Sequence, residues 1–445
     1  MNKTKTRLTA LVTVGVLGAG VLAGCSAGGG DTADEDVTLK WWAPNLMPTI
    51  AQDEAYYKTL TDKFTEETGI KVETQVNAWA DYYNKILGAI SSGEGPDVMA
   101  SGTTWVSTLT PSGGFLQFDD ASLEAIGGAE QFTETAWDAA GGQNEGGTSM
   151  IPWVAGVTTM FYNTKLFEEA GITEAPTTWP EFLEDAKKLT VDTDGDGKID
   201  QWGFGYPAGF AQEWSHTMFA FGEQNGTAFF DEDGNPTLNG EGMVDAADQF
   251  LQLMTTDKVL NPASAELQGM SDVQQQFING EVAIMFGSGS NTSFDDAGFT
   301  DYAAAQIVLN DPLPGEAVTT HIAGVDMGVF AETDHQEQAL EFMKFLVSEE
   351  TQIDMAKNIK GILPVNTAAA ADADVSSDPV FKVNTEILAN TAAGFPDNLL
   401  TGQAETLIGD ALKGLAAQAA TQGSVSRADI QAALDEANSQ LEASQ

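Results

Sequence analysis

A short acidic segment near the middle of the chain has the residue types and the spacing of a calcium-binding loop. Positions 1, 3, 5 and 9 of this segment are acidic and position 6 is glycine, as in an EF-hand loop. Gly203 stands at position 12, where an EF-hand carries a bidentate glutamate. The segment is therefore either a structural Ca²⁺ site or a solvated acidic turn. The predicted ligands are the side chains of Asp192, Asp194, Asp196 and Asp200 and the backbone carbonyl of Lys198.

A second set of residues combines aromatic faces with carboxylate and amide groups. Neutral sugars stack their C–H faces on aromatic rings, and their hydroxyls form hydrogen bonds with carboxylates and amides. Ligands of α/β sheets bind outside the carboxyl ends of the strands, and several of these residues follow predicted strands. The candidate ligand-binding residues are Trp42, Asn45, Trp79, Asp97, Trp105, Trp153, Trp214, Asn291 and Asp326.

Each of these candidates also has a structural explanation. Adjacent strand residues point to opposite faces of a sheet, so only one of Trp41 and Trp42 can face a ligand, and we choose Trp42. Asp97 can instead brace the loop that precedes its strand. Trp214 and His216 fall in a predicted loop, and we expect His216 to be a structural histidine rather than a ligand contact.

The composition excludes several classes of protein. The chain carries 19 Lys and Arg against 66 Asp and Glu, a formal net charge of −47, whereas nucleic-acid binding needs cations that neutralise phosphate. A single cysteine excludes a disulfide framework and a cysteine-based zinc site. The arginines are Arg7 and Arg427 alone, so an arginine clamp for carboxylate or phosphate is not expected. A neutral ligand fits this composition best.

Two other functions stay open on these residues. A cationic solute such as a polyamine suits aromatic rings combined with carboxylates, and its binding would weaken with ionic strength, unlike that of a sugar. A secreted glycoside hydrolase would use a pair of carboxylates, which one sequence does not identify. The chain has no G-x-S-x-G, H-E-x-x-H or Walker motif, and we expect a protein that is not an enzyme.

The first predicted elements of the mature chain, which must position several of these residues, alternate between strands and helices. Val37–Ala43, Ile70–Val76 and Asp97–Ala100 are predicted strands, and Gln52–Glu67 and Asp81–Ser91 are predicted helices between them. This β-α-β-α-β order favours a mostly parallel sheet with helices on its faces.

The rest of the chain continues as a mixed α/β pattern. Thr178 and Glu181 form a predicted capping box at the start of a helix, and Ala368–Ser377 is a low-complexity segment that we expect to be a loop. The other predicted strands are Met150–Asn163, Glu281–Phe286 and Gly324–Ala331. The other predicted helices are Gln338–Ser348 and Ser426–Leu441.

The N-terminus is typical of an exported lipoprotein. Basic residues precede an apolar run, Leu8–Ala23, that is shorter than the ~20 residues a spanning helix needs. The run ends in Leu22-Ala23-Gly24-Cys25, which resembles a bacterial lipobox whose cysteine becomes lipid-modified. We therefore expect a signal peptide over 1–24, lipidation at Cys25 and a flexible tether over 25–36. The alternative is a plain signal peptide with an incidental cysteine.

Several short segments in a fixed order add a family resemblance. They are Gly93–Val98, Ile151–Pro152, Phe161–Phe167, Ala170–Gly171, Pro176–Phe182, Gly280–Met285 and Gly361–Pro364. Together, and behind a lipobox, they resemble the extracellular solute-binding proteins of bacterial carbohydrate ABC importers, the maltose-binding-protein-like family. The resemblance runs from Val37 to roughly Asn366.

This resemblance implies a two-lobed periplasmic-binding-protein-like α/β fold. A hinge crossed three times, near Pro152, Thr320 and Gly361, would leave a ligand cleft between the lobes and place Trp153 beside it. The expected N-terminal lobe is 37–152 with 321–361, and the expected C-terminal lobe is 153–320 with 362–445.

The resemblance also implies a function. We expect a monomeric, lipid-anchored protein at the outer face of a bacterial membrane that captures a neutral sugar by lobe closure. It would deliver this sugar to the permease subunits of an ABC importer. The nine tryptophans favour an oligosaccharide over a monosaccharide.

Overall fold

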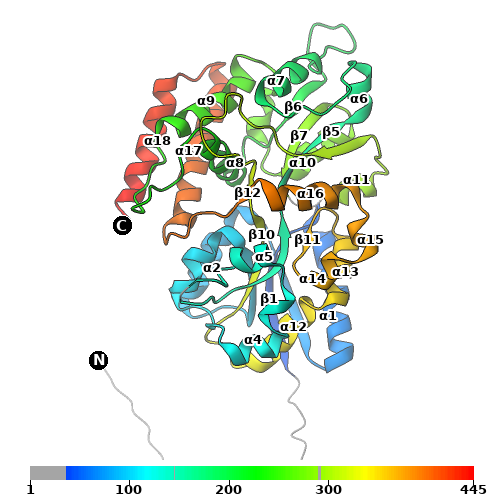
Figure 1. Cartoon of the computed structure of the whole chain (residues 1–445), viewed down its shortest axis with the longest axis vertical. Coiled ribbons are helices and arrows are strands. Elements are labelled where there is room, and N and C mark those ends of the chain that lie inside the picture. Colours follow the sequence, from blue (N-terminus) through cyan, green and yellow to red (C-terminus); the bar gives the residue numbers. More distant parts are fainter. Residues whose placement is uncertain (1–36, 145, 289–291, 445) are drawn as a thin grey trace, which may run out of the picture. The chain divides into compact units, whose positions relative to one another are not determined.

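The computed structural model describes residues 37–144, 146–288 and 292–444 (Figure 1). The predicted signal peptide, Cys25, the tether and Asn291 lie outside the described residues. The described chain forms two α/β lobes, each built around its own sheet. No helix in the described part of the chain combines the length and the apolar character that crossing a bilayer requires.

The sheet of the N-terminal lobe has six strands in the order β11-β4-β10-β3-β1-β2. The strands are β1 (Thr38–Pro44), β2 (Lys71–Asn77), β3 (Val98–Gly102), β4 (Ile151–Gly156), β10 (Ala323–Val329) and β11 (Leu363–Pro364). β1 pairs in parallel with β2 and β3, as the alternating pattern predicted. β10 runs antiparallel to β3 and β4, so the whole sheet is mixed rather than mostly parallel.

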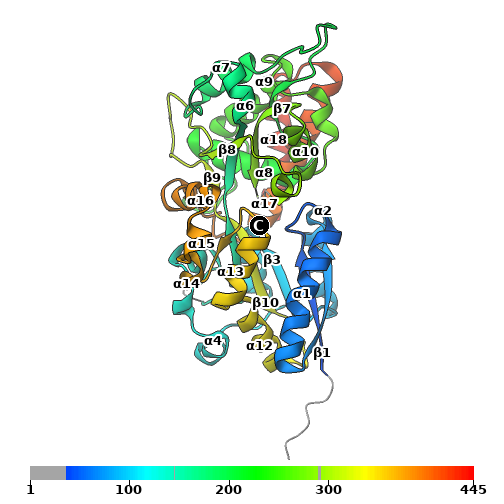
Figure 2. The same ribbon diagram turned by 90° about the vertical axis from the view of Figure 1, so that its right-hand side faces the viewer.

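Helices cover this sheet because each has an apolar face that packs against the apolar side chains of the strands. α1 begins after the N-cap Thr49 and ends at Gly69, whose φ of 82° suits glycine. Figure 2 shows α1 lying along β1. The helices of this lobe are α1 (Ile50–Thr68), α2 (Trp79–Ser92), α3 (Val106–Leu109), α4 (Asp120–Ile126), α5 (Glu134–Ala139), α12 (Gln336–Leu346) and α13 (Glu349–Asn358).

The segment expected to be a loop, 368–377, instead contains parts of two short helices, α14 (Thr367–Ala370) and α15 (Ala373–Ser376). The side chain of Asn366 accepts hydrogen bonds from two backbone N–H groups at the start of α14, and Asp372 does the same for α15. Such caps satisfy the unpaired donors of a helix start, and this is how alanine-rich segments of one turn become helical.

The sheet of the C-terminal lobe has four strands in the order β6-β7-β5-β8. They are β5 (Thr158–Asn163), β6 (Trp202–Gly205), β7 (Val282–Ser288) and β8 (Tyr302–Ala305). The predicted capping box of Thr178 with Glu181 is present. The helices are α6 (Thr164–Glu169), α7 (Trp179–Lys188), α8 (Ala211–Gln224), α9 (Glu241–Thr255), α10 (Met270–Ile278), α11 (Thr292–Asp296), α16 (Pro379–Asn390), α17 (Thr401–Gln422) and α18 (Arg427–Glu442).

The structure moves two of the expected lobe boundaries. β4 continues to Gly156, so the chain leaves the N-terminal sheet after this residue and not at Pro152. A short strand, β9 (Thr320–His321), pairs with β12 (Ala392–Ala393) in a separate two-stranded sheet immediately before β10.

The third boundary also lies later than expected. Leu363 and Pro364 pair with β4 in the N-terminal sheet, so the chain has not left this lobe at residue 362. The third crossing falls at α16, because Val380 is buried in the core of the C-terminal lobe whereas Phe381 and Leu388 pack against the core of the N-terminal lobe.

Candidate ligand-binding site

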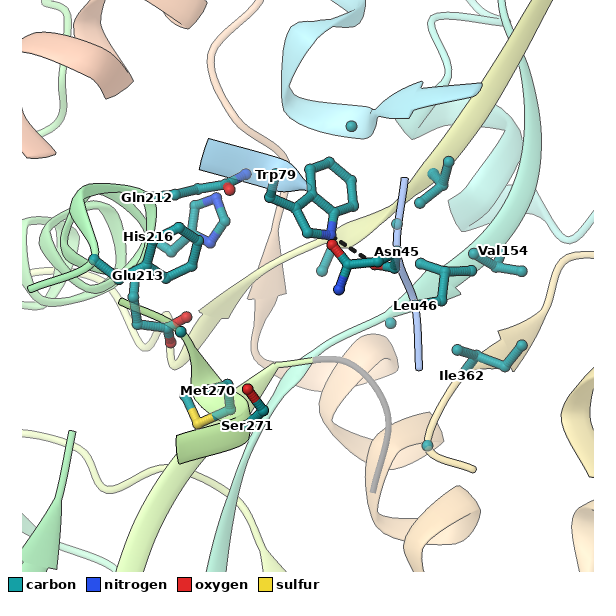
Figure 3. Close-up of a pocket in the computed structure, with 18 of the residues that line it drawn as sticks. Asn45, Leu46, Trp79, Val154, Gln212, Glu213, His216, Met270, Ser271 and Ile362 are labelled. Carbon is teal, nitrogen blue, oxygen red and sulfur yellow. Dashed lines mark hydrogen bonds between the residues drawn. The ribbon is translucent and has the colours of Figure 1, made fainter. Parts of the chain in front are cut away.

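A pocket of about 350 Å³ is lined by residues of both lobes (Figure 3). This volume lies at the lower end of the range for small-molecule sites, roughly 300–1,000 Å³. The N-terminal lobe contributes the loop after β1, the start of α2 and the chain just after β3, all at the carboxyl ends of parallel strands. This is where an α/β sheet was expected to bind its ligand.

The wall formed by the N-terminal lobe is largely apolar. Its centre is the indole of Trp79, the first residue of α2. The ring is held by a hydrogen bond of 2.8 Å from its N–H to the backbone carbonyl of Asn45, and by the ring of Trp105 with centroids 5.6 Å apart. The apolar residues of this wall are Leu46, Met47, Pro48, Ala78, Trp79, Ala80, Val154, Ala155, Ala323, Val325 and Ile362.

The wall formed by the C-terminal lobe is largely polar, although Phe210 and Met270 also line it. The first turns of α8 and α10 both face the pocket, and the N-cap residues Phe210 and Gly269 provide no side-chain cap. Backbone N–H groups at such helix starts can donate to ligand oxygens. The polar side chains of this wall are Gln212, Glu213, His216, Gln268, Ser271, Gln274 and His321.

The pocket has little charge for so acidic a protein. Glu213 is the only carboxylate among its described lining residues, and no lysine or arginine lines it. An anionic ligand would therefore be repelled by this carboxylate and would meet no lysine or arginine among the described lining residues, which agrees with the expectation of a neutral ligand.

Two histidines and a glutamate form a buried group at the polar wall. The rings of His216 and His321 lie with centroids 3.9 Å apart, and His216 Nε2 is 3.3 Å from Oε1 of Glu405 on α17. Burial, together with the neighbouring His216, holds the pKa of His321 well below its usual value. His321 is thus neutral at neutral pH, with one ring nitrogen a donor and the other an acceptor.

Sequence reasoning missed most of the polar wall. His216 was expected to be structural, but it lines the pocket, and it lies in helix α8 rather than in a loop. Gln212, Glu213 and His216 have the spacing of one helix face, and this was the available signal. His321 and Gln274 carried no comparable signal.

Of the predicted ligand contacts, Asn45 and Trp79 line the pocket. Trp105 does not, because it packs behind Trp79 with only 5% of its surface exposed. Trp153 and Trp214 are corrected as well, since each is buried in the core of a lobe. Trp153 packs against other aromatic residues, and the indole N–H of Trp214 donates to the carbonyl of Ala208.

Three further candidates also lie outside the pocket lining. The ring of Trp42 is half-buried and carries the ammonium of Lys85 at 3.7 Å from its centroid. Asp97 precedes β3, at the end of the strand opposite the pocket, and accepts a hydrogen bond of 2.7 Å from the backbone N–H of Lys40. Asp326 is buried within β10, and this burial raises its pKa to about 8.

The acidic loop brings three of its four predicted carboxylates together. Oxygens of Asp192, Asp194 and Asp200 lie within 4.8 Å of one another, which is the reach of two Ca–O bonds of ~2.4 Å. Hydrogen bonds from the hydroxyl and backbone N–H of Thr193 lower the pKa of Asp200 and so favour its charged form. Asp196 lies outside this cluster, with Oδ2 3.6 Å from the ammonium of Lys198.

Comparisons with known proteins identify relatives of similar length. The profile of the family described as bacterial extracellular solute-binding protein matches residues 48–353. A binding protein of Brucella abortus is 26% identical over 359 residues, covering 79% of this chain and 82% of its own. The diacetylchitobiose-binding protein DasA of Streptomyces coelicolor is 25% identical over 369 residues, covering 78% and 80%.

Solved structures share the fold at lower sequence identity. Maltose-bound MalE3 of T. maritima superimposes with a TM-score of 0.77 at 18% identity, covering 92% of this chain and 100% of its own. The maltotriose-bound MalE domain of Bdellovibrio bacteriovorus gives a TM-score of 0.74 at 23% identity, covering 92% and 99%.

Proposed function

The chain belongs to the family of bacterial extracellular solute-binding proteins, and from that premise we propose that its pocket captures a neutral sugar for an ABC importer. The observation that carries this proposal is the two-sided pocket. An apolar wall with one indole suits the C–H face of a sugar ring, and a wall of amides, imidazoles and helix starts suits its hydroxyls.

The relatives support this ligand class. DasA is a diacetylchitobiose-binding protein, and the T. maritima and B. bacteriovorus proteins are bound to maltose and maltotriose. A cavity of about 350 Å³ and a single lining tryptophan among the described residues favour a sugar of few rings. The number of tryptophans is thus a poor guide to oligosaccharide length, because Trp41, Trp153 and Trp214 are core residues.

The remaining parts of the proposal concern how the protein works in the cell. We propose that the protein is a monomer tethered by lipid on Cys25 to the outer face of the membrane. Contacts of both lobes with the sugar favour the closed state, and the closed state delivers the sugar to the permease. The relatives are binding proteins, and we propose that this chain likewise leaves its sugar chemically unchanged.

Calorimetric titration tests the ligand class. The purified chain without its signal peptide is titrated with maltose, maltotriose, N,N′-diacetylchitobiose, D-tagatose and, as a cationic probe, spermidine. We expect saturable binding of one sugar, an affinity that changes little between about 0.05 M and about 0.5 M salt, and recovery of intact sugar. Binding of spermidine alone, lost at high salt, would favour the cationic alternative, and hydrolysed sugar would favour an enzyme.

A matched pair of variants on one helix sharpens this test. Glu213→Gln removes the lining carboxylate and should weaken sugar binding by about tenfold, because a hydrogen bond to a charged group contributes about 1–1.5 kcal/mol more than one to a neutral amide. Glu223→Gln, at the other end of α8 and outside the pocket lining, should leave the affinity unchanged. If the two substitutions changed the sugar affinity equally, the ligand would not bind beside Glu213.

We also propose that the acidic loop holds a structural Ca²⁺, with Asp192, Asp194 and Asp200 as ligands. Three oxygens within bonding reach of one ion support this proposal. Added Ca²⁺ should raise the melting temperature of the wild type and of Asp231→Asn, a control in another exposed turn whose carboxylate accepts backbone hydrogen bonds. Asp192→Asn should abolish the increase. A wild type that melts identically with Ca²⁺ and with chelator would make the loop a solvated turn.

A further inference from the structure

The loop between β1 and α1 forms a large part of the apolar wall, although it has no strand or helix to hold it. Asn45, Leu46, Met47 and Pro48 all line the pocket. Backbone groups of such a loop need partners outside regular structure. The N–H of Asn45 donates to the carbonyl of Asn77 at 3.0 Å, and the carbonyl of Asn45 accepts the indole N–H of Trp79.

The next two backbone donors of this loop converge on one carboxylate. The N–H groups of Leu46 and Met47 both donate to Oδ1 of Asp53, each at 3.0 Å. Asp53 lies in the first turn of α1 and is completely buried. It does not line the pocket, so its carboxylate reaches the ligand wall only through the loop.

The surroundings of Asp53 add further burial and a further hydrogen bond to this arrangement. The neighbouring Tyr57 is also fully buried, and its hydroxyl donates to the carbonyl of Pro44 at 3.1 Å, just before the loop. The loop is therefore held at Pro44, Asn45, Leu46 and Met47 in succession. Burial raises the pKa of Asp53 to about 6, although the two backbone hydrogen bonds oppose this change. Burying a carboxyl group costs free energy unless hydrogen bonds compensate for the lost water, and the two bonds to the loop supply this compensation.

We propose that Asp53 is a positioning residue for sugar binding, which holds Leu46 and Met47 in place as a preformed apolar wall opposite the polar helices. The proposal rests on the proposed function, because it assigns Asp53 to the same pocket. A wall that is already ordered needs no further loss of loop entropy when the sugar binds, and the affinity is higher for that reason.

Two readouts separate positioning from a general contribution to folding. In the unliganded protein, hydrogen exchange of the Leu46 and Met47 amides reports whether the loop is held. Calorimetric titration with whichever sugar of the panel above saturates the wild type reports the affinity. Asp53→Ala removes the acceptor, whereas Asp53→Asn keeps a carbonyl oxygen at the same place.

A control removes a comparable carboxylate far from the pocket. Asp119 caps α4 and accepts the backbone N–H of Ser122 at 2.8 Å, in the same lobe and outside the pocket lining. Asp119→Ala should lower the melting temperature without changing the sugar affinity. Asp53→Ala should speed exchange of the two amides and weaken binding by about tenfold or more, and Asp53→Asn should restore both towards the wild type.

Each outcome decides the proposal. Wild-type affinity and slow exchange in Asp53→Ala would overturn it, as would an affinity that falls only as far as in Asp119→Ala. If the alanine variant does not fold, Asp53→Ser replaces it, because its hydroxyl is too close to the backbone to reach both donors. If no sugar binds the wild type, the proposed function fails, and the exchange experiment still decides whether Asp53 holds the loop.

Discussion

The indole N–H of Trp79 donates a hydrogen bond of 2.8 Å to the backbone carbonyl of Asn45, so the aromatic face of the pocket and its adjoining loop are joined directly. The donor begins α2 and the acceptor follows β1, and the parallel pairing of β1 with β2 brings these two chain segments together. The orientation of the ring is therefore set by the sheet rather than by the ligand.

Trp79 should be the substitution with the largest effect on affinity at the apolar wall. Trp79→Ala removes the aromatic face and should weaken sugar binding by roughly 10- to 100-fold, since a buried aromatic side chain contributes about 1.5–3 kcal/mol. Trp79→Phe keeps a ring but loses the bond to Asn45, and an intermediate loss is expected. Trp42→Phe is the control, because this ring contacts Lys85 outside the pocket. Calorimetry in which the two phenylalanine variants bind equally well would contradict the role of Trp79.

His321 should make the protein less stable in mild acid. Its folded-state pKa lies well below 6.5, so between these values the unfolded chain binds a proton that the folded chain excludes. The contribution of His321 to the free energy of unfolding therefore falls as the pH drops below 6.5, by up to about 1.4 kcal/mol per pH unit.

Urea denaturation at pH 7.5 and pH 5 measures this effect. From pH 7.5 to pH 5, the free energy of unfolding of His321→Gln should fall less, or rise more, than that of the wild type. His335→Gln, which changes a histidine outside the pocket, should follow the wild type. A His321→Gln variant with the wild-type pH dependence would show that another group dominates.

Asp326 should act in the opposite direction at higher pH. Its pKa is raised from 3.8 to about 8 by burial, so the folded chain holds a proton that the unfolded chain releases. The contribution of Asp326 to the free energy of unfolding should decline by up to about 1.4 kcal/mol per unit as the pH rises through this interval. Asp326→Asn resembles the protonated acid and should flatten the decline in denaturation experiments at pH 5 and pH 8. Equal declines in Asp97→Asn and Asp326→Asn would refute the assignment.

A pair of glycines in α17 tests how tightly this helix supports the polar wall. A Cβ at Gly409 would lie 2.3 Å from the backbone oxygen of Ala211, at the start of α8. Gly409→Ala should therefore displace the first turn of α8, lower stability by roughly 1–3 kcal/mol and weaken sugar binding.

Gly414 of the same helix has open space around it. Gly414→Ala should raise stability by up to about 1 kcal/mol through helix propensity and leave the affinity unchanged. Thermal unfolding and titration of the two variants measure both quantities. If Gly409→Ala changed neither the stability nor the affinity, α17 and α8 could move apart without cost, and the argument would fail.

Local sequence patterns predicted most elements of the fold and part of the pocket. Strand ends and helix starts have recognisable signals, such as the capping box at Thr178 and the glycine after α1. Asn45 and Trp79 were identified because they lie one and two residues after the strands of the parallel β1–β2 pair, and the carboxyl ends of such strands meet at one edge.

Predictions based on residue type alone were less successful. Trp153 and Trp214 have the chemistry of sugar-stacking residues, yet they are core residues, because an indole buries more apolar surface than most side chains and cores use it for that reason. Asp97 lies at the amino end of β3, whereas ligands bind at the carboxyl end. The sequence pattern did not separate the two ends of this strand, because polar residues flank both of them.

The sequence by itself determined the acidic, arginine-poor composition, the alternation of strands and helices, and the motifs that resemble the family. These depend on residue types and on spacing along the chain. The tertiary structure alone decided that His216 and His321 lie together opposite Trp79, and that Asp53 supports the loop beside it. His216 and His321 are more than a hundred positions apart, and their contact depends on how α8 and β9 pack, which local patterns do not encode.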